Sequence, residues 1–321
     1  MKILRISILL LILLCFGFFI RSMDLSKVAD AIRHLGYRFG WLLLATFAGY
    51  FFATVGWQFC MGMQGKQLSL NKLFLVRQIG EAVSVINPTN AVGGEAMKMY
   101  LLRGTSVSQA TLLTAALVSR TLMVVAQVVL FLVTAAVLKG PALQLPGSFT
   151  SVFIAGAFLI ATILLVKYRD FFRKQMLHTR WGRKLASRAA PAKARLENVR
   201  TDLQAYFRNS PKAMLAALLF FTLYWVSDSM ELYLILYFLD VKVTVLQAVM
   251  ANTGVAFYKA AAGFIPGQIG VEEYANRVML GAVGAPGEEI WLTVSLIRRT
   301  RQLCWIVFGL LIYLIRYKND A

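Results

Sequence analysis

Residues 87–95 read Asn-Pro-Thr-Asn-Ala-Val-Gly-Gly-Glu and form a polar, helix-breaking stretch between two apolar runs. A related stretch, residues 264–273, reads Phe-Ile-Pro-Gly-Gln-Ile-Gly-Val-Glu-Glu. In both, a proline is followed by glycine and then by glutamate, and a further glycine comes nine positions after Glu95 and after Glu272. Because the two glutamates are 177 positions apart (272 minus 95), the stretches predict an internal repeat.

Each stretch is followed by an arginine within a long apolar run, Arg120 in the first case and Arg298 in the second. Chance is the alternative explanation, since proline and glycine are frequent in membrane helices. The recurrence of deep arginines as well as helix breakers favours the repeat.

The composition is that of an integral membrane protein. The chain has 321 residues, of which 59% are hydrophobic and 15% charged, and its mean hydropathy is +0.65. Soluble domains are closer to half apolar and a quarter charged. The apolar runs are far longer than barrel strands, which predicts an all-α protein. The net charge of +19 fits basic cytoplasmic loops, so we expect no nucleic-acid partner.

The apolar runs predict a polytopic helical membrane protein with about six full transmembrane helices: residues 6–20, 41–61, 112–138, 149–166, 213–239 and 290–315. The first run lacks a signal-peptide cleavage site and is therefore interpreted as a helix. Residues 73–86 and 271–283 are too short to cross, because about 14 residues rise only about 21 Å. We therefore predict two re-entrant hairpins, near residues 73–103 and 245–283, with loops enclosed by protein or water.

We interpret residues 1–321 as one membrane domain, with a first repeat at 1–138 and a second at 149–315. A cytoplasmic loop at 167–212, with thirteen basic and three acidic residues, is inserted in the second repeat. Its charge either sets topology alone or also binds anionic lipid headgroups. The predicted membrane-surface residues are Arg173, Lys174, Arg183 and Lys184.

With the basic loop in the cytoplasm, alternation of the spans places both termini in the cytoplasm. Residues 21–40 then lie outside although they carry four basic residues, which the charge rule disfavours. The hairpins enter from opposite faces, so the repeats are inverted, as in many transporters whose sites form at broken helices near the midplane.

Helices beginning at Gly94 and Gly270 would present unpaired N–H groups and a positive dipole end, which attract anions. Arg120 and Arg298 add fixed positive charge and need acidic partners inside a membrane. The arrangement is either an ion-pair network that only fixes helix packing, or a polar cavity for a phosphate-bearing lipid headgroup. The predicted substrate-binding residues are Gly93, Gly94, Glu95, Arg120, Asp228, Glu231, Pro266, Gly267, Gly270, Glu272, Glu273 and Arg298.

At these residues the chain resembles the membrane region of the lysylphosphatidylglycerol synthase family, also called flippase-like. The matching residues are Pro88, Gly93, Gly94, Glu95, Leu101, Leu102 and Gly104, then Pro266, Gly267, Gly270 and Glu272 or Glu273. Gln268 departs from the family pattern, which usually has glycine there. The resemblance spans nearly the whole chain and implies a lipid-translocating module in the bacterial inner membrane, with anionic membrane lipids as partners.

Two-part relatives carry a soluble aminoacyl-transferase domain after the membrane region, and the last predicted span here is followed closely by Ala321. We therefore do not expect that activity, and with no nucleotide, hydrolase or metal motif we expect neither an enzyme nor a cofactor. Translocation by alternating access is the favoured function. A lipid-modifying enzyme, or a non-transporting partner of an envelope-lipid synthesis complex such as one for hopanoids, is the alternative.

Overall fold

The computed structural model describes residues 33, 35–86, 91–138, 211–261, 270–285 and 287–317. In that part of the chain every regular element is a helix, which confirms the all-α prediction. The spans expected at 6–20 and 149–166, and nearly all of the basic loop at 167–212, lie outside the described residues.

Four helices are long: α3 (Arg38–Cys60), α7 (Gln109–Val137), α11 (Pro211–Phe238) and α14 (Glu288–Ile312). Among the described residues, α3, α7 and α11 are long and apolar enough to cross a membrane, by length and composition. A single π-helical segment, Tyr313–Tyr317, continues α14. These helices match four of the predicted spans to within a few residues.

The starts of two long helices differ slightly from the apolar runs for local reasons. Helix α7 begins three residues before the run at 112, because Ser108 Oγ accepts a hydrogen bond from the Thr111 N–H at 3.0 Å and caps the helix. Pro211 is the first described residue of helix α11, two residues before the run at 213, and proline is compatible with the first turn of a helix because it needs no N–H partner there.

Five described helices are shorter. One is the four-residue helix α4 (Gly62–Gly65), and the other four pack in consecutive pairs: α5 (Leu70–Ile86) with α6 (Ala91–Leu101), and α12 (Val245–Ala261) with α13 (Val271–Ala282). The longest have 17 residues and rise about 26 Å, less than the roughly 30 Å hydrocarbon core. Helix α6 begins at Ala91, three residues before the expected start at Gly94. Helix α13 begins as expected, after Gly270 at φ 82°, a conformation that favours glycine.

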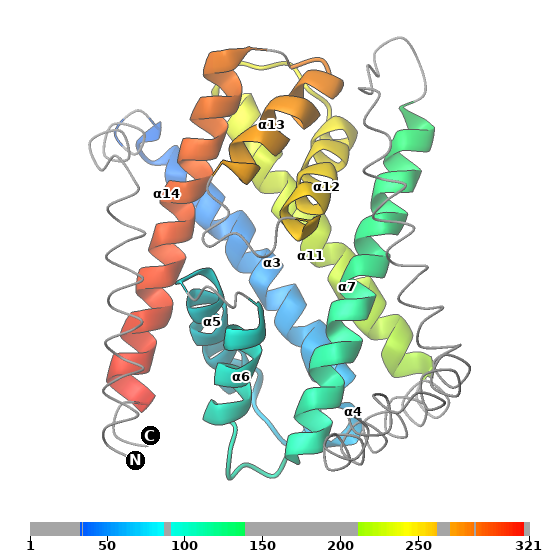
Figure 1. Cartoon of the computed structure of the whole chain (residues 1–321), viewed down its shortest axis with the longest axis vertical. Helices are drawn as coiled ribbons and strands as arrows, with labels where there is room; N and C mark the ends of the chain where they lie inside the picture. The colour runs from blue at the N-terminus through cyan, green and yellow to red at the C-terminus, as the bar shows by residue number, and fades with distance from the viewer. Residues whose placement is uncertain are drawn as a thin grey trace, which may run out of the picture.

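The two short pairs occupy opposite halves of the molecule. In Figure 1, α5 and α6 lie in the lower half and α12 and α13 in the upper half, while α7 and α14 run roughly along the long axis and α3 and α11 run obliquely to it. Apart from the four-residue helix α4, the described helices occur twice in the order long, short, short, long. The inverted-repeat and re-entrant interpretations remain predictions with which this order agrees.

Helices α3 and α11 make the most extensive contact between described elements. Close approach depends on glycine, because a Cβ at Gly56 of α3 would lie 2.8 Å from the Phe221 ring of α11. These two helices pack along one another and run obliquely through the molecule in Figure 1.

Apolar side chains form two separate cores, one including Leu42 and Ile235 and the other including Trp57 and Phe221. On α11 the two sets are separated by the polar pair Asp228 and Ser229. A polar layer thus lies between two apolar ends, and it contains the candidate site.

Candidate functional site

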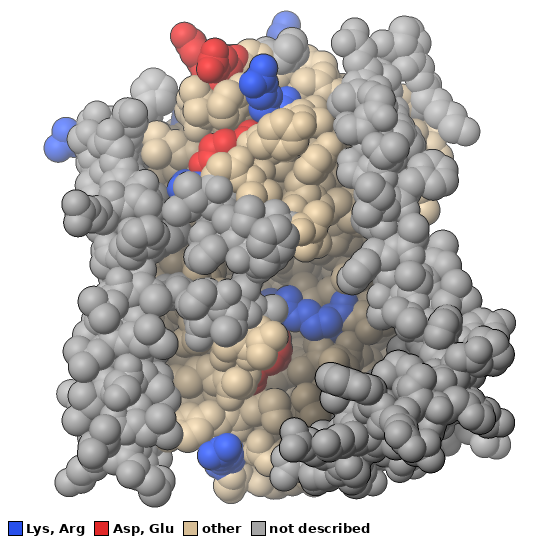
Figure 2. Space-filling view, in the orientation of Figure 1, with Lys and Arg blue, Asp and Glu red and all other residues tan. Residues whose placement is uncertain are grey.

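A cavity of about 620 Å³ lies in this polar layer. Its walls come from the four long helices and from the four helices of the two short pairs. The charged residues that line it are Arg77, Glu81, Arg120, Asp228, Lys259, Glu272, Arg298 and Arg301. Figure 2 shows Lys and Arg side chains at mid-height in a hollow of one face. Val92 near the start of α6 and Ala260 near the end of α12 both line the cavity, so the ends of both short pairs reach it.

Five residues of α5, α6 and α7 form what we call the first cluster: Arg77, Glu81, Glu95, Lys98 and Arg120. Lys98 Nζ lies 3.1 Å from Glu81 Oε1 and 3.0 Å from Glu95 Oε1. Arg120 Nη2 contacts the same Glu95 oxygen at 3.1 Å, and Arg77 Nη2 lies 3.5 Å from Glu81 Oε1. The cluster therefore confirms proximity between the predicted residues Glu95 and Arg120, and adds three charged neighbours.

Two glycines permit the burial of Lys98. A Cβ at Gly80 would lie 2.5 Å from Lys98 side-chain carbons, and a Cβ at Gly94 would collide with Ser84 Oγ and the Gly80 carbonyl oxygen. The ammonium also lies 5.7 Å from the centre of the Trp57 ring, at cation–π distance. Lys98 is thus held between α5 and α6 with two carboxylates and an aromatic face, which compensates its lost hydration.

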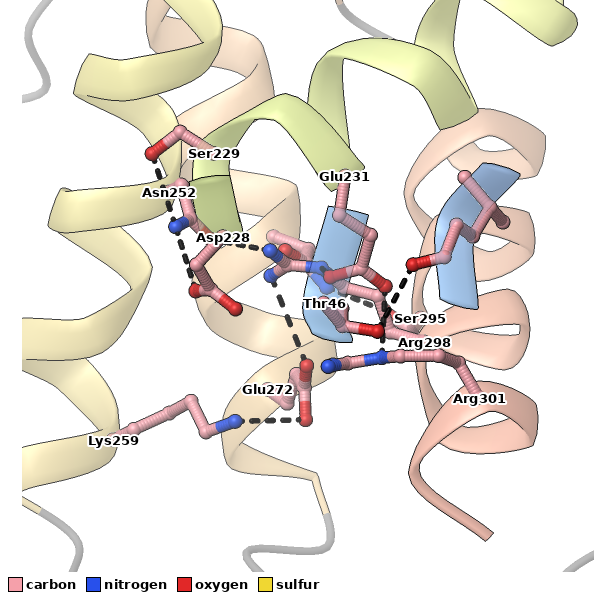
Figure 3. Close-up of polar contacts among 12 residues, drawn as sticks. Thr46, Asp228, Ser229, Glu231, Asn252, Lys259, Glu272, Ser295, Arg298 and Arg301 are labelled. Atoms are coloured by element: carbon pink, nitrogen blue, oxygen red, sulfur yellow. Dashed lines mark hydrogen bonds and ion pairs between the residues drawn. The ribbon is translucent and has the colours of Figure 1, made fainter. Parts of the chain in front are cut away.

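A second cluster, drawn in Figure 3, joins α11, α12, α13 and α14 through charged residues and one amide: Asp228, Glu231, Asn252, Lys259, Glu272, Arg298 and Arg301. Glu231 is fully buried, with Arg301 Nε 2.9 Å and Arg298 Nε 3.7 Å from its two oxygens. Glu272 lies 3.2 Å from Lys259 Nζ and 3.9 Å from Arg298 Nη1. Each buried charge thereby has an opposite charge nearby.

Asn252 connects the remaining acidic residue to this network. Its side-chain oxygen accepts a hydrogen bond from Arg298 Nη2. Its amide nitrogen donates to Asp228 Oδ2 at 2.9 Å and to Ser229 Oγ at 3.2 Å. The structure therefore brings the predicted residues Asp228, Glu231, Glu272 and Arg298 together through a residue that was not predicted.

Glu273 has a different role from the one expected. Its carboxylate accepts the Gly270 N–H at 2.9 Å and pairs with Arg299 at 2.5 Å, and neither Glu273 nor Arg299 lines the cavity. The expectation of free N–H groups at this helix start is corrected at Gly270, because the first turn of α13 already holds two carboxylates. Gly93 and Gly94 lie within the first turns of α6, whose opening turn contains no acidic residue.

The remaining predicted residues lie outside the described part of the chain: Pro266, Gly267, Arg173, Lys174, Arg183 and Lys184. Conversely, six residues of the two clusters were not among the predicted site residues: Arg77, Glu81, Lys98, Asn252, Lys259 and Arg301. Five of them are charges within or beside apolar runs, a signal that could have identified them. Asn252 carries no comparable signal in the sequence.

A family model described as the lysylphosphatidylglycerol synthase TM region matches residues 3–310, a range that includes both clusters and every described helix except the last turns beyond 310. The chain belongs to this family. It is therefore a membrane protein of a family concerned with lipid handling. No curated protein and no solved structure gives a significant match.

Proposed function

We propose that this member of the family translocates an anionic envelope lipid across the bacterial inner membrane by alternating access. The headgroup would pass through the cavity while the tails remain in the bilayer. The observation that carries the proposal is the charged cavity reached by the ends of both short-helix pairs. A membrane protein that needed only packing could fill this space with apolar side chains at lower cost.

The chemistry of the cavity suits a phosphate. Arg120 lines it with a partly exposed guanidinium, and Arg298, Arg301 and Lys259 also line it. Guanidinium groups bind phosphate oxygens with paired, charge-assisted hydrogen bonds. Moving a charged headgroup without such partners through hydrocarbon would cost several kcal/mol, about 2.5–3.5 kcal/mol even for a charged side chain on insertion scales.

The charges at the two ends of the molecule support the proposed orientation. At the end where α5 begins, the described charged residues are all basic: Lys66, Lys72, Arg103, Lys212 and Arg316. At the other end, basic residues are mixed with Asp240, Glu288 and Glu289. Because cytoplasmic loops carry excess Lys and Arg, the first end would face the cytoplasm, as would both termini.

The test is movement of a labelled phospholipid between the leaflets of vesicles containing the purified protein, followed by quenching of the outer leaflet. We expect Glu95→Ala and Arg120→Ala to slow this movement, because they remove the contact that presents the guanidinium to the cavity. Arg103→Ala is the matched control, since Arg103 is exposed beyond the end of α6 and does not line the cavity. Unchanged rates in both Glu95→Ala and Arg120→Ala would contradict the mechanism.

Two other experimental outcomes would indicate a function other than translocation. A chemically altered lipid, detected by mass spectrometry in cells that overproduce the protein, would indicate an enzyme. Loss of movement after deleting part of residues 170–210 would favour a role as a partner of lipid-synthesis proteins, because a translocator should largely retain movement without that segment.

A further inference from the structure

The formal charges of the described residues around the cavity do not cancel. Among described residues that line it or pair with those lining it, six are basic (Arg77, Lys98, Arg120, Lys259, Arg298 and Arg301) and five are acidic (Glu81, Glu95, Asp228, Glu231 and Glu272). Six minus five leaves one positive charge. The neighbouring pair of Arg299 and Glu273 is balanced and does not alter the difference.

The excess belongs to the first cluster. The second cluster has three basic and three acidic residues, whereas the first has three basic and two acidic residues. Glu95 Oε1 is shared between Lys98 and Arg120, so one carboxylate oxygen serves two cations. One cation of the first cluster is therefore incompletely compensated.

Arg120 is the cation best placed to bind a ligand. Its side chain is 44% exposed and lines the cavity, whereas the side chains of Lys98 and Arg77 are 6% and 7% exposed. The first turns of α6 and α13 differ in the same direction. The first turn of α13 contains Glu272 and Glu273, which compensate the positive end of the helix dipole, whereas the first turn of α6 contains no acidic residue. Both observations place the unsatisfied positive charge beside α6.

We infer that the cargo carries one net negative charge, as in a phosphodiester headgroup whose remaining groups are uncharged. This inference rests on the proposed function and names the substrate class. A single negative charge neutralises the cavity during passage through a low-dielectric region, where an unbalanced charge is costly. A zwitterionic headgroup leaves the positive charge unbalanced, and a doubly charged phosphate monoester or diphosphate overcompensates it.

The experiment compares three labelled lipids in vesicles at pH 8: phosphatidylglycerol with one negative charge, phosphatidylcholine with none, and phosphatidic acid, a monoester close to two. We expect phosphatidylglycerol to move at least about tenfold faster than phosphatidylcholine, which corresponds to a modest electrostatic preference. Equal rates, or a preference for the zwitterion, would overturn the inference while leaving translocation intact.

Charge-changing variants make the test specific. Glu81→Gln adds a positive charge and should shift the preference towards phosphatidic acid, whereas Arg120→Gln removes one and should shift it towards phosphatidylcholine. If Glu81→Gln does not fold, Asp228→Asn adds the same positive charge at another residue that lines the cavity. Arg103→Gln, outside the cavity, should retain the original order. An order unchanged in all cavity variants would contradict the inference.

Failure of the proposed function gives a distinct result, because no labelled lipid would then move with the unaltered protein. In that case binding in detergent micelles still tests the charge rule, using the fluorescence of Trp225 and Trp305, which line the cavity. The inference predicts tightest binding of phosphatidylglycerol, with weaker competition by soluble glycerophosphoglycerol. Competition by inorganic phosphate alone, without lipid binding, would show that the site takes a free anion and would overturn the lipid assignment.

Discussion

The two charged clusters share a plan and differ in exposure. In each, a glutamate near the start of the second short helix pairs with an arginine on the following long helix, Glu95 with Arg120 at 3.1 Å and Glu272 with Arg298 at 3.9 Å. The Arg120 side chain is 44% exposed, whereas that of Arg298 is 5% exposed. The same pairing therefore leaves one arginine available to a ligand and encloses the other.

The surroundings explain this difference. Arg298 contacts Glu231, Glu272 and Asn252, which come from three different helices. Within 4.0 Å, Arg120 has one acidic partner among the described residues, Glu95, which it shares with Lys98. We conclude that the second cluster mainly holds helices together, while the first cluster provides the ligand-binding charge.

The largest expected effect is on stability, from Glu231→Gln in the second cluster. This change leaves two buried arginines without their shared carboxylate, and removing one partner of a buried ion pair costs about 3–5 kcal/mol. Thermal unfolding in detergent should show a clear drop in Tm. Glu289→Gln, at the exposed start of α14, is the control and should unfold like the unaltered protein. If Glu231→Gln and Glu289→Gln had the same Tm, the second cluster would have no role in stability.

Arg120→Gln should chiefly weaken binding of the lipid headgroup. Loss of a charge-assisted hydrogen bond worth about 1.5–3 kcal/mol corresponds to a roughly 10–100-fold loss of binding or translocation. Its partly exposed ion pair contributes at most about 1 kcal/mol to stability, so Tm should change little. Arg298→Gln should instead lower Tm, because it breaks buried contacts. If Arg120→Gln and Arg298→Gln changed Tm and lipid translocation equally, the assignment of ligand binding to the first cluster and of helix packing to the second would be wrong.

The packing of the first short pair is tested by Gly94→Ala. The added methyl meets Ser84 Oγ and the Gly80 carbonyl oxygen, and overpacking of this kind costs about 1–3 kcal/mol. Gly281→Ala, in the corresponding helix of the second pair, has nothing within 4 Å of the new Cβ and should be neutral or slightly stabilising. The comparison is made by Tm, and an unaltered Tm for Gly94→Ala would contradict the close contact between α5 and α6.

Glu273→Gln should have the smallest effect on lipid translocation. The amide oxygen can still accept the Gly270 N–H, while the largely buried ion pair with Arg299 is lost, which should lower stability by about 1–3 kcal/mol. Because Glu273 does not line the cavity, the lipid translocation rate should stay within about twofold of the original. A larger loss of translocation would place Glu273 in the binding site, as the sequence analysis expected.

Helix positions were largely predictable from the sequence, because long apolar runs and helix breakers act locally. The four described long helices and both short pairs appear where the runs and the Pro-Gly stretches place them. The predictions were wrong at some helix starts. Helix α6 begins at Ala91 and not at Gly94, because Gly93 and Gly94 are accommodated within the helix.

The site was predictable only in part. Glu95, Arg120, Glu272 and Arg298 could be identified because charges deep in apolar runs need a reason to be there. Which acid meets which base depends on how helices distant in sequence pack, so Lys98 between Glu81 and Glu95 could not be foreseen. The capping role of Glu273 depends on backbone geometry at Gly270, which sequence spacing alone does not specify.

The central claim, that the ends of both short pairs share one charged cavity, is tested most directly by thiol labelling. Val92→Cys and Ala260→Cys, in a cysteine-free background, would be exposed to a water-soluble thiol reagent with and without phosphatidylglycerol, beside Arg103→Cys at a water-exposed turn. Because Val92 and Ala260 are exposed in the structure, we predict that both cysteines label, that phosphatidylglycerol protects both, and that it leaves the labelling of Arg103→Cys unchanged. Labelling of both cavity positions that the lipid does not slow would contradict the shared cavity.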